Sequence, residues 1–197
     1  MYKTQGIILA TDAIGEADLS LSVFTRDFGK LLFVAQGVRK RDSKLRSILQ
    51  AGHMIDFVFV PMRSGRYRLT SPAIIECFSG IRNEPRKLAA LLLSLAVFDK
   101  VVLEGAHDEA MWDFLNEWMS ELSEIPPFEE RERAAVHFWF LSGLLEVLGY
   151  GAREYGGASL RDSLVRAGEG FSKDAQSLRK AFASKLSFFL PDNCLVQ

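Results

Sequence analysis

Residues 24–50 read FTRDFGKLLFVAQGVRKRDSKLRSILQ, and this stretch sets the fold that we expect for the chain. A turn at 26–30 contains Gly29, which can adopt positive φ. The apolar run 31–35 predicts a strand that is buried over most of its surface, and Gly37 releases the chain from it. Five cations then stand against the single acid Asp42: Arg39, Lys40, Arg41, Lys44 and Arg46. A rigid barrel that presents such a loop is suited to binding phosphates.

The flanking sequence predicts four more strands and one short helix. Strands are expected at 6–10, 19–23, 30–36, 54–60 and 66–77, because apolar residues alternate there with polar ones or run continuously between turn signals. The helix is expected at 43–50, with Ser43 as its N-cap. Five strands with a helix between the third and fourth predict a small closed barrel of the OB type. In the fifth strand, Arg66, Arg68 and Thr70 share one face.

Beyond about Glu84 the apolar pattern becomes helical. We expect a buried helix at 87–103, an amphipathic helix over 111–122 and a third helix after Pro126 and Pro127. The third helix should carry Glu129, Glu130 and Glu132 in its first turn and end at Gly149. A last helix is expected between Ser172 and Pro191. The prediction is therefore an α+β protein, with an OB-type domain at 1–80 and a helical domain at 81–197.

Charge and cysteine content narrow the class of protein. The net charge of the 197 residues is only −1, but residues 1–80 carry +4 and residues 81–197 carry −5. Cys77 and Cys194 lie far apart, so neither a four-cysteine zinc site nor a disulfide framework is indicated. The first residues do not resemble a signal peptide, and the apolar run 88–98 is too short to cross a bilayer. We expect a cytoplasmic protein.

The cationic residues are the strongest candidates for a binding site. A charge run such as 39–46 is commonly just a solvated segment, but Arg63, Arg66 and Arg68 add a second group of cations on the barrel. Phe28, Phe33 or Tyr67 offers a face for stacking a base, although ordinary core packing is the more usual role of such residues. The predicted DNA-binding residues are Lys30, Arg39, Lys40, Arg41, Lys44, Arg46, Arg66 and Arg68.

Catalysis finds little support in the sequence. His53, His107 and His137 are isolated, and no nucleophile-elbow, phosphate-loop or zinc-protease motif is present. We expect neither an enzyme nor a cofactor or metal requirement, although an active site of an unrecognised kind remains an alternative.

Several elements together resemble the RecO family of bacterial recombination mediators. They are Gly6-Ile7-Ile8-Leu9, Gly15-Glu16-Ala17-Asp18, Phe24-Thr25 with Gly29-Lys30, Val34-Ala35-Gln36-Gly37-Val38-Arg39, and Ser43-x-Leu45-x-x-x-Leu49-Gln50. The resemblance covers the first 80 residues or so. It implies binding of single- and double-stranded DNA, annealing of complementary strands, and cooperation with RecR and single-stranded DNA-binding protein in loading RecA.

The resemblance is weaker in the second half. Leu148-Gly149-Tyr150 is similar to the family's motif before a zinc segment, yet residues 153–162 contain no cysteine. We therefore expect a compact, zinc-free member. The resemblance also implies a helical-domain pocket for the acidic tail of single-stranded DNA-binding protein, with Arg131, Arg133, Arg179 and Lys180 as candidates for its rim. The rival hypothesis is a non-enzymatic protein-interaction adaptor with a structural barrel.

Overall fold

A computed structural model describes residues 1–129 and 133–150 of the chain. The chain divides into two compact units, and each is described by itself. The first unit contains Met1–Phe78 together with Val102–Trp112. The second contains Ser79–Val101 and the residues from Asp113 onward. The division into domains 1–80 and 81–197 stays a prediction, and it assigns the segment Val102–Trp112 differently from these units.

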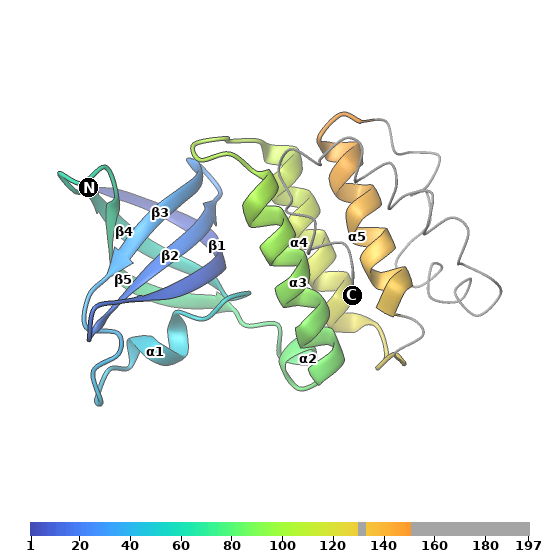
Figure 1. Cartoon of the computed structure of the whole chain (residues 1–197), viewed down its shortest axis with the longest axis horizontal. Helices are drawn as coiled ribbons and strands as arrows, with labels where there is room; N and C mark the ends of the chain where they lie inside the picture. Colours follow the sequence, from blue (N-terminus) through green and yellow to red (C-terminus); the bar gives the residue numbers. More distant parts are fainter. Residues whose placement is uncertain (130–132, 151–197) are drawn as a thin grey trace. The chain divides into compact units, whose positions relative to one another are not determined.

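The first unit is built on a closed five-stranded barrel (Figure 1). Its strands are β1 (Tyr2–Ile14), β2 (Asp18–Thr25), β3 (Gly29–Ala35), β4 (Met54–Pro61) and β5 (Tyr67–Glu76), in the spatial order β1-β2-β3-β5-β4. All neighbouring pairs are antiparallel except β3 and β5, which close the barrel in parallel through Phe33–Tyr67 and Val34–Arg68. The short helix α1 (Leu45–Ile48) lies between β3 and β4. The predicted α+β fold with an OB-type barrel is confirmed.

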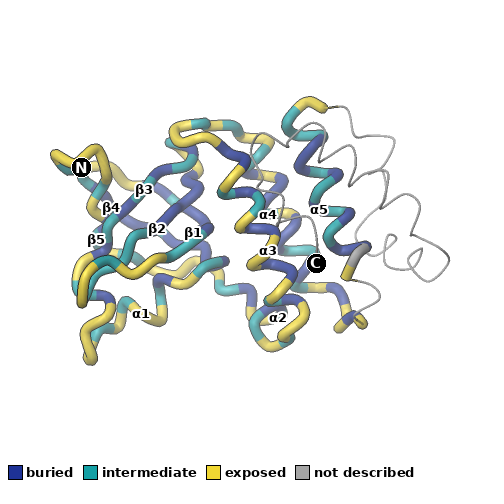
Figure 2. Tube along the Cα trace, in the orientation of Figure 1, coloured by how far each residue is buried: buried dark blue, intermediate teal, exposed yellow. Residues whose placement is uncertain are grey.

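The barrel encloses an aromatic core, and buried positions recur along its strands (Figure 2). Strand β3 alternates strictly between buried and half-buried residues, so Leu31, Phe33 and Ala35 point inward. Phe33 packs edge-on against Phe57 and Phe59, with ring centroids 5.1 and 5.4 Å apart. Burying a side chain of this size stabilises the fold by roughly 1.5–3 kcal/mol. The interior is therefore filled with side chains and leaves only the outer surface for binding.

Two local predictions in the barrel need correction. Strand β1 is 13 residues long, well beyond the predicted 6–10, because it pairs with β4 through Tyr2–Ile7 and with β2 as far as Ile14. Its register shifts between Ile8 and Ala10. Ser43 does not cap α1, since the N-cap is Lys44 and forms no side-chain cap bond. Lys44 already has helical dihedral angles, and the helix itself begins at Leu45.

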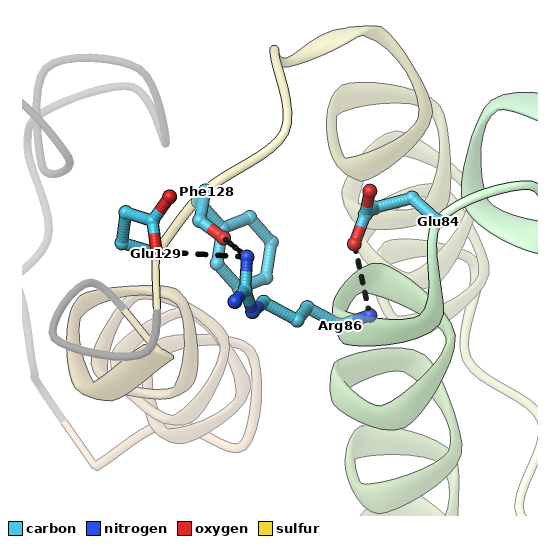
Figure 3. A network of polar contacts seen from close by, with 4 residues as sticks. All are labelled: Glu84, Arg86, Phe128 and Glu129. Carbon is cyan, nitrogen blue, oxygen red and sulfur yellow. Dashed lines mark hydrogen bonds and ion pairs between the residues drawn. The ribbon is translucent and has the colours of Figure 1, made fainter.

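The second unit contains α2 (Ser79–Arg82), α3 (Pro85–Val101), most of α4 (Glu109–Glu124) and α5 (Arg133–Val147). Pro85 occupies the first position of α3, where its missing N–H costs no hydrogen bond. Figure 3 shows the contacts at this helix start: Glu84 Oε1 accepts from the Arg86 backbone N–H (3.2 Å), and the Arg86 guanidinium donates to the Phe128 carbonyl (3.3 Å). Arg86 also pairs with Glu129 at 3.6 Å. These contacts join α3 to the segment before α5.

The predicted end of the third helix is confirmed, but its predicted start is not. Gly149 has φ +82° and donates to the Glu146 carbonyl, while Tyr150 donates to the Leu145 carbonyl. This pair of bonds is a Schellman cap. Glu129 precedes α5 rather than lying in its first turn, and Glu130 and Glu132 lie outside the described residues. The predicted last helix also lies outside them.

None of the described helices is both long and apolar enough to cross a membrane.

Candidate nucleic-acid interface

Residues 39–46, here called the cationic loop, lie at the end of the barrel that carries α1. This loop end also contains the β1–β2 turn at residues 15–17, whereas the β2–β3 turn at 26–28 and the β4–β5 turn at 62–66 lie at the opposite hairpin end (Figure 1). The side chains of Arg39, Lys40, Arg41, Lys44 and Arg46 are all exposed. The loop therefore presents five positive charges to solvent from one end of the barrel.

Backbone contacts hold the start of the cationic loop against the β1–β2 turn. The Gly37 N–H donates to Asp18 Oδ1 (2.8 Å), and Gly37 has the positive φ of +70° that this turn needs. The Arg39 N–H donates to the Ala17 carbonyl (2.8 Å), and its guanidinium donates to the Gly15 carbonyl (2.9 Å). The guanidinium keeps further N–H donors for a ligand, because only one of them is used here.

The end of the loop is anchored by apolar residues rather than by its charges. Leu49 is buried in the barrel core, and Leu45 and Ile48 pack partly against that core. The buried His53 contacts the Ile48 carbonyl through Nδ1 at 2.8 Å. The backbone at Lys44 and Arg46 is thus fixed by neighbouring apolar contacts, while the side chains of both residues are exposed to solvent.

Arg68 and Arg66 are two further exposed cations, at the start of β5 and in the turn before it. Arg68 lies opposite Val34 of β3, and its side chain is exposed because the flanking Tyr67 and Leu69 point toward the core. Arg66 lies in the turn before β5, where its carbonyl accepts from the Met62 N–H (2.8 Å). The alternation predicted for this strand holds as far as Thr70, after which the pairing with β4 shifts register.

Lys30 lies apart from the cationic loop. It is the second residue of β3 and lies opposite Phe24, so about 17 Å of extended strand separates it from the far end of β3. Its carbonyl accepts from the Gly105 N–H (2.8 Å), and its backbone forms an isolated parallel β-bridge with Glu104. Lys30 is half-buried, and an acidic residue stands beside it. The structure therefore groups five of the predicted residues in the loop, places Arg68 in β5 and Arg66 in the turn before it, and puts Lys30 in a different setting.

The exposed cations keep their charge available. Within the described residues, no ion pair joins an acid to Arg39, Lys40, Arg41, Lys44, Arg46, Arg66 or Arg68. By contrast, Lys3 pairs with Asp56 at 2.9 Å on the outer surface of β1 and β4. A surface hollow of about 570 Å³ opens there, and its lining mixes cations with Asp27, Asp56 and Glu109. This mixed lining suits a polyanion less well than the cationic loop does.

The aromatic candidates differ in exposure. Phe33 is fully buried and cannot reach a ligand, so its suggested stacking role is wrong. Phe28 and Tyr67 are half-buried and also pack against the barrel core. Tyr2, which sequence reasoning missed, is 49% exposed at the start of β1. The only signal for it was an aromatic residue between Met1 and Lys3, before any apolar run.

The remaining candidates from the sequence lie partly outside the described residues. Within residues 1–129 and 133–150, no three or more His, Cys, Asp or Glu side chains are arranged to hold a metal ion. Arg133 is exposed at the start of α5, whereas Arg131, Arg179 and Lys180 lie outside the described residues. The cysteine-free segment 153–162 lies outside them as well.

Comparison with known proteins matches the barrel and part of the helices. Residues 1–78 match the family model described as "Recombination protein O N terminal". DNA repair protein RecO of Moorella thermoacetica is 29% identical over 153 residues, which cover 78% of this chain and 55% of that protein. RecO of Cutibacterium acnes is 29% identical over 153 residues (78% and 52%), and RecO of Nostoc is 27% identical over 149 residues (73% and 50%).

These findings identify the chain in terms of its fold and its relatives. It is an OB-type barrel protein with a cationic loop at one barrel end and a helical second part. Its first 78 residues match the RecO N-terminal family model, and most of its length is similar to proteins named DNA repair protein RecO. It spans about half the length of the curated relatives that it matches.

Proposed function

We propose that this protein acts in DNA repair and recombination by binding single- and double-stranded DNA through the phosphate backbone. The observation that carries the proposal is the set of seven exposed cations on the loop and β5, none of which is ion-paired within the described residues. Such side chains neutralise phosphates without reading sequence. The relatives named DNA repair protein RecO support the same role.

The proposed mechanism is strand alignment rather than turnover chemistry. Lysine and arginine side chains that hold phosphates leave the bases free to meet a complementary strand. The binding residues are Arg39, Lys40, Arg41, Lys44, Arg46, Arg66 and Arg68, with Lys30 as a peripheral contact because Glu104 lies beside it. In this proposal the protein anneals strands and, with RecR and single-stranded DNA-binding protein, helps to load RecA. It does so in the bacterial cytoplasm.

Salt-dependent DNA binding tests the proposal. The logarithm of the affinity for an oligonucleotide should fall linearly with the logarithm of salt concentration, by about 0.7 per phosphate neutralised on a single strand. Annealing of two complementary oligonucleotides, bare or coated with single-stranded DNA-binding protein, tests the mechanism. A folded protein that shows neither a salt slope nor annealing would instead fit an adaptor with a structural barrel.

A further inference from the structure

Tyr2 forms an exposed aromatic surface at the hairpin end of the barrel. It is 49% exposed, although it belongs to β1 and pairs in register with Phe59 of β4. Its ring stacks on the Phe59 ring at 5.3 Å with an interplanar angle of 26°. Phe28, in the β2–β3 turn, meets the Tyr2 ring edge-on at 5.6 Å. Phe59 therefore stacks on one face of the Tyr2 ring, Phe28 makes a second, perpendicular contact, and about half of the residue stays exposed.

The support beneath Tyr2 is rigid. Phe59 is only 1% exposed and makes edge-on contacts with Phe28, Phe33 and Tyr67, with centroids 5.3–5.4 Å apart. The β2–β3 turn is held to β1, because the Thr4 hydroxyl donates to Asp27 Oδ2 (2.6 Å). An aromatic ring fixed in this way loses little conformational freedom when a second ring stacks on it.

Exposed cations stand in both turns of the hairpin end. Arg26 lies in the β2–β3 turn, two residues before Phe28, and Arg63 and Arg66 lie in the β4–β5 turn. No ion pair within the described residues involves any of these three side chains. Proteins bind single-stranded nucleic acid by combining aromatic rings, on which bases stack, with cations that meet the phosphates.

We propose that the Tyr2 ring stacks an unpaired base of single-stranded DNA. The inference rests on the proposed DNA-binding function and adds a base contact to its phosphate contacts. Bases in a duplex are stacked on one another and turned away from the protein, so they cannot use this ring without unpairing. Tyr2 therefore gives the barrel a preference for single strands that the cationic loop alone does not provide.

The test uses the full chain, oligo(dT), and a strand of equal length in which every base is replaced by an abasic tetrahydrofuran residue. Tyr2→Ala should weaken binding to oligo(dT) by about five- to 150-fold, the range found for loss of one base–aromatic stack. Its affinity for the base-free strand should be unchanged, because that strand keeps only the phosphates. Tyr2→Phe should bind both strands like the wild type. Tyr150→Ala, which removes an exposed tyrosine from the second unit, is the matched control and should change neither.

The alternatives give different results. Equal losses on both strands would mean that the ring acts through the fold or the phosphates, and equal wild-type affinity on both would mean that it contacts no DNA. Either result overturns the inference, and the second would leave Tyr2 as a protein-contact residue. Failure of the proposed function is distinguishable, because the wild-type protein would then bind neither strand with a salt slope.

Discussion

The cationic loop of the barrel and Lys87 of the helical unit hold the same kind of charge in opposite settings. The loop side chains are exposed, and none is ion-paired within the described residues. Lys87 is only 3% exposed, and its Nζ donates to the carbonyls of Ser123 (3.0 Å) and Ile125 (2.5 Å) at the end of α4. Burial lowers the pKa of Lys87, and the nearby Glu84 partly offsets this effect. The cations proposed to bind DNA and the lysine buried in the helical unit are thus distinguished by their surroundings, not by residue type.

The largest expected effect comes from reversing the charge of two residues in the cationic loop. Arg39→Glu combined with Arg41→Glu should weaken binding to single-stranded oligonucleotides on the order of 100-fold, because two phosphate contacts become repulsive. Fluorescence anisotropy at several salt concentrations measures both the loss and the change in slope. Circular dichroism should be unchanged, since Arg39 makes its second turn contact through the backbone N–H. Wild-type affinity in the folded double variant would remove the loop from the interface.

Removing the buried cation should have the reverse outcome. Lys87→Ala leaves the Ser123 and Ile125 carbonyls without their shared donor and opens a gap beside α4. We expect a loss of about 2–3 kcal/mol in the free energy of unfolding, measured by urea denaturation. The affinity of the remaining folded protein for DNA should not change. A clear DNA-binding defect in a folded Lys87→Ala protein would contradict the division between the two kinds of cation.

Neutralising one cation at a time compares how much each cation of the barrel contributes to DNA affinity. Lys40→Gln, in the exposed loop, should reduce single-strand affinity by about three- to fivefold and lower the magnitude of the salt slope by about 0.7. Lys30→Gln should have a smaller effect, because Lys30 is half-buried and lies beside Glu104. The two variants are compared by anisotropy under identical salt. An effect of Lys30→Gln as large as that of Lys40→Gln would place the DNA across the start of β3.

The smallest expected effect is a dependence of stability on alkaline pH. Because the folded pKa of Lys87 lies below its ordinary value of 10.5, the unfolded chain holds more protons than the folded chain between these two values. The free energy of unfolding should therefore rise with pH across that interval. Lys87→Met should lose this rise, so the difference between its denaturation curves and those of the wild type isolates Lys87. A constant difference across the interval would contradict the lowered pKa.

Much of the barrel and the helices could be predicted because local patterns set them. The alternation in β3 places Phe33 inward and Val34 outward, and Gly149 follows an apolar helix as a C-cap should. Exposure of the loop cations also follows from their type, since lysine and arginine side chains are rarely buried unless paired. These features depend on neighbours in sequence, which pattern reasoning reads directly.

The features that escaped prediction depend on contacts distant in sequence. The residues around Lys87 do not predict that its ammonium group will donate hydrogen bonds to carbonyls almost 40 positions away. The stacking of the Tyr2 ring could not be predicted, because it depends on the pairing of β1 with β4, which places Phe59 against Tyr2. Lys30 was grouped with the loop by its charge, whereas the return of Glu104 and Gly105 to β3 gives it a different environment.

The return of Val102–Trp112 to the barrel has a practical consequence for anyone who excises the domain. Three contacts hold this segment to the barrel. Gly29 has φ +68°, and a side chain there would overlap the Ala106 carbonyl. The ring centroids of Trp112 and Phe24 lie 6.3 Å apart, and His107 Nε2 donates to the Arg26 carbonyl (2.9 Å). A fragment that stops at residue 78, the limit of the family match, would uncover these groups. Such a fragment should be less stable and more prone to aggregation than the intact chain, so its DNA binding would be a poor guide to that of the intact chain.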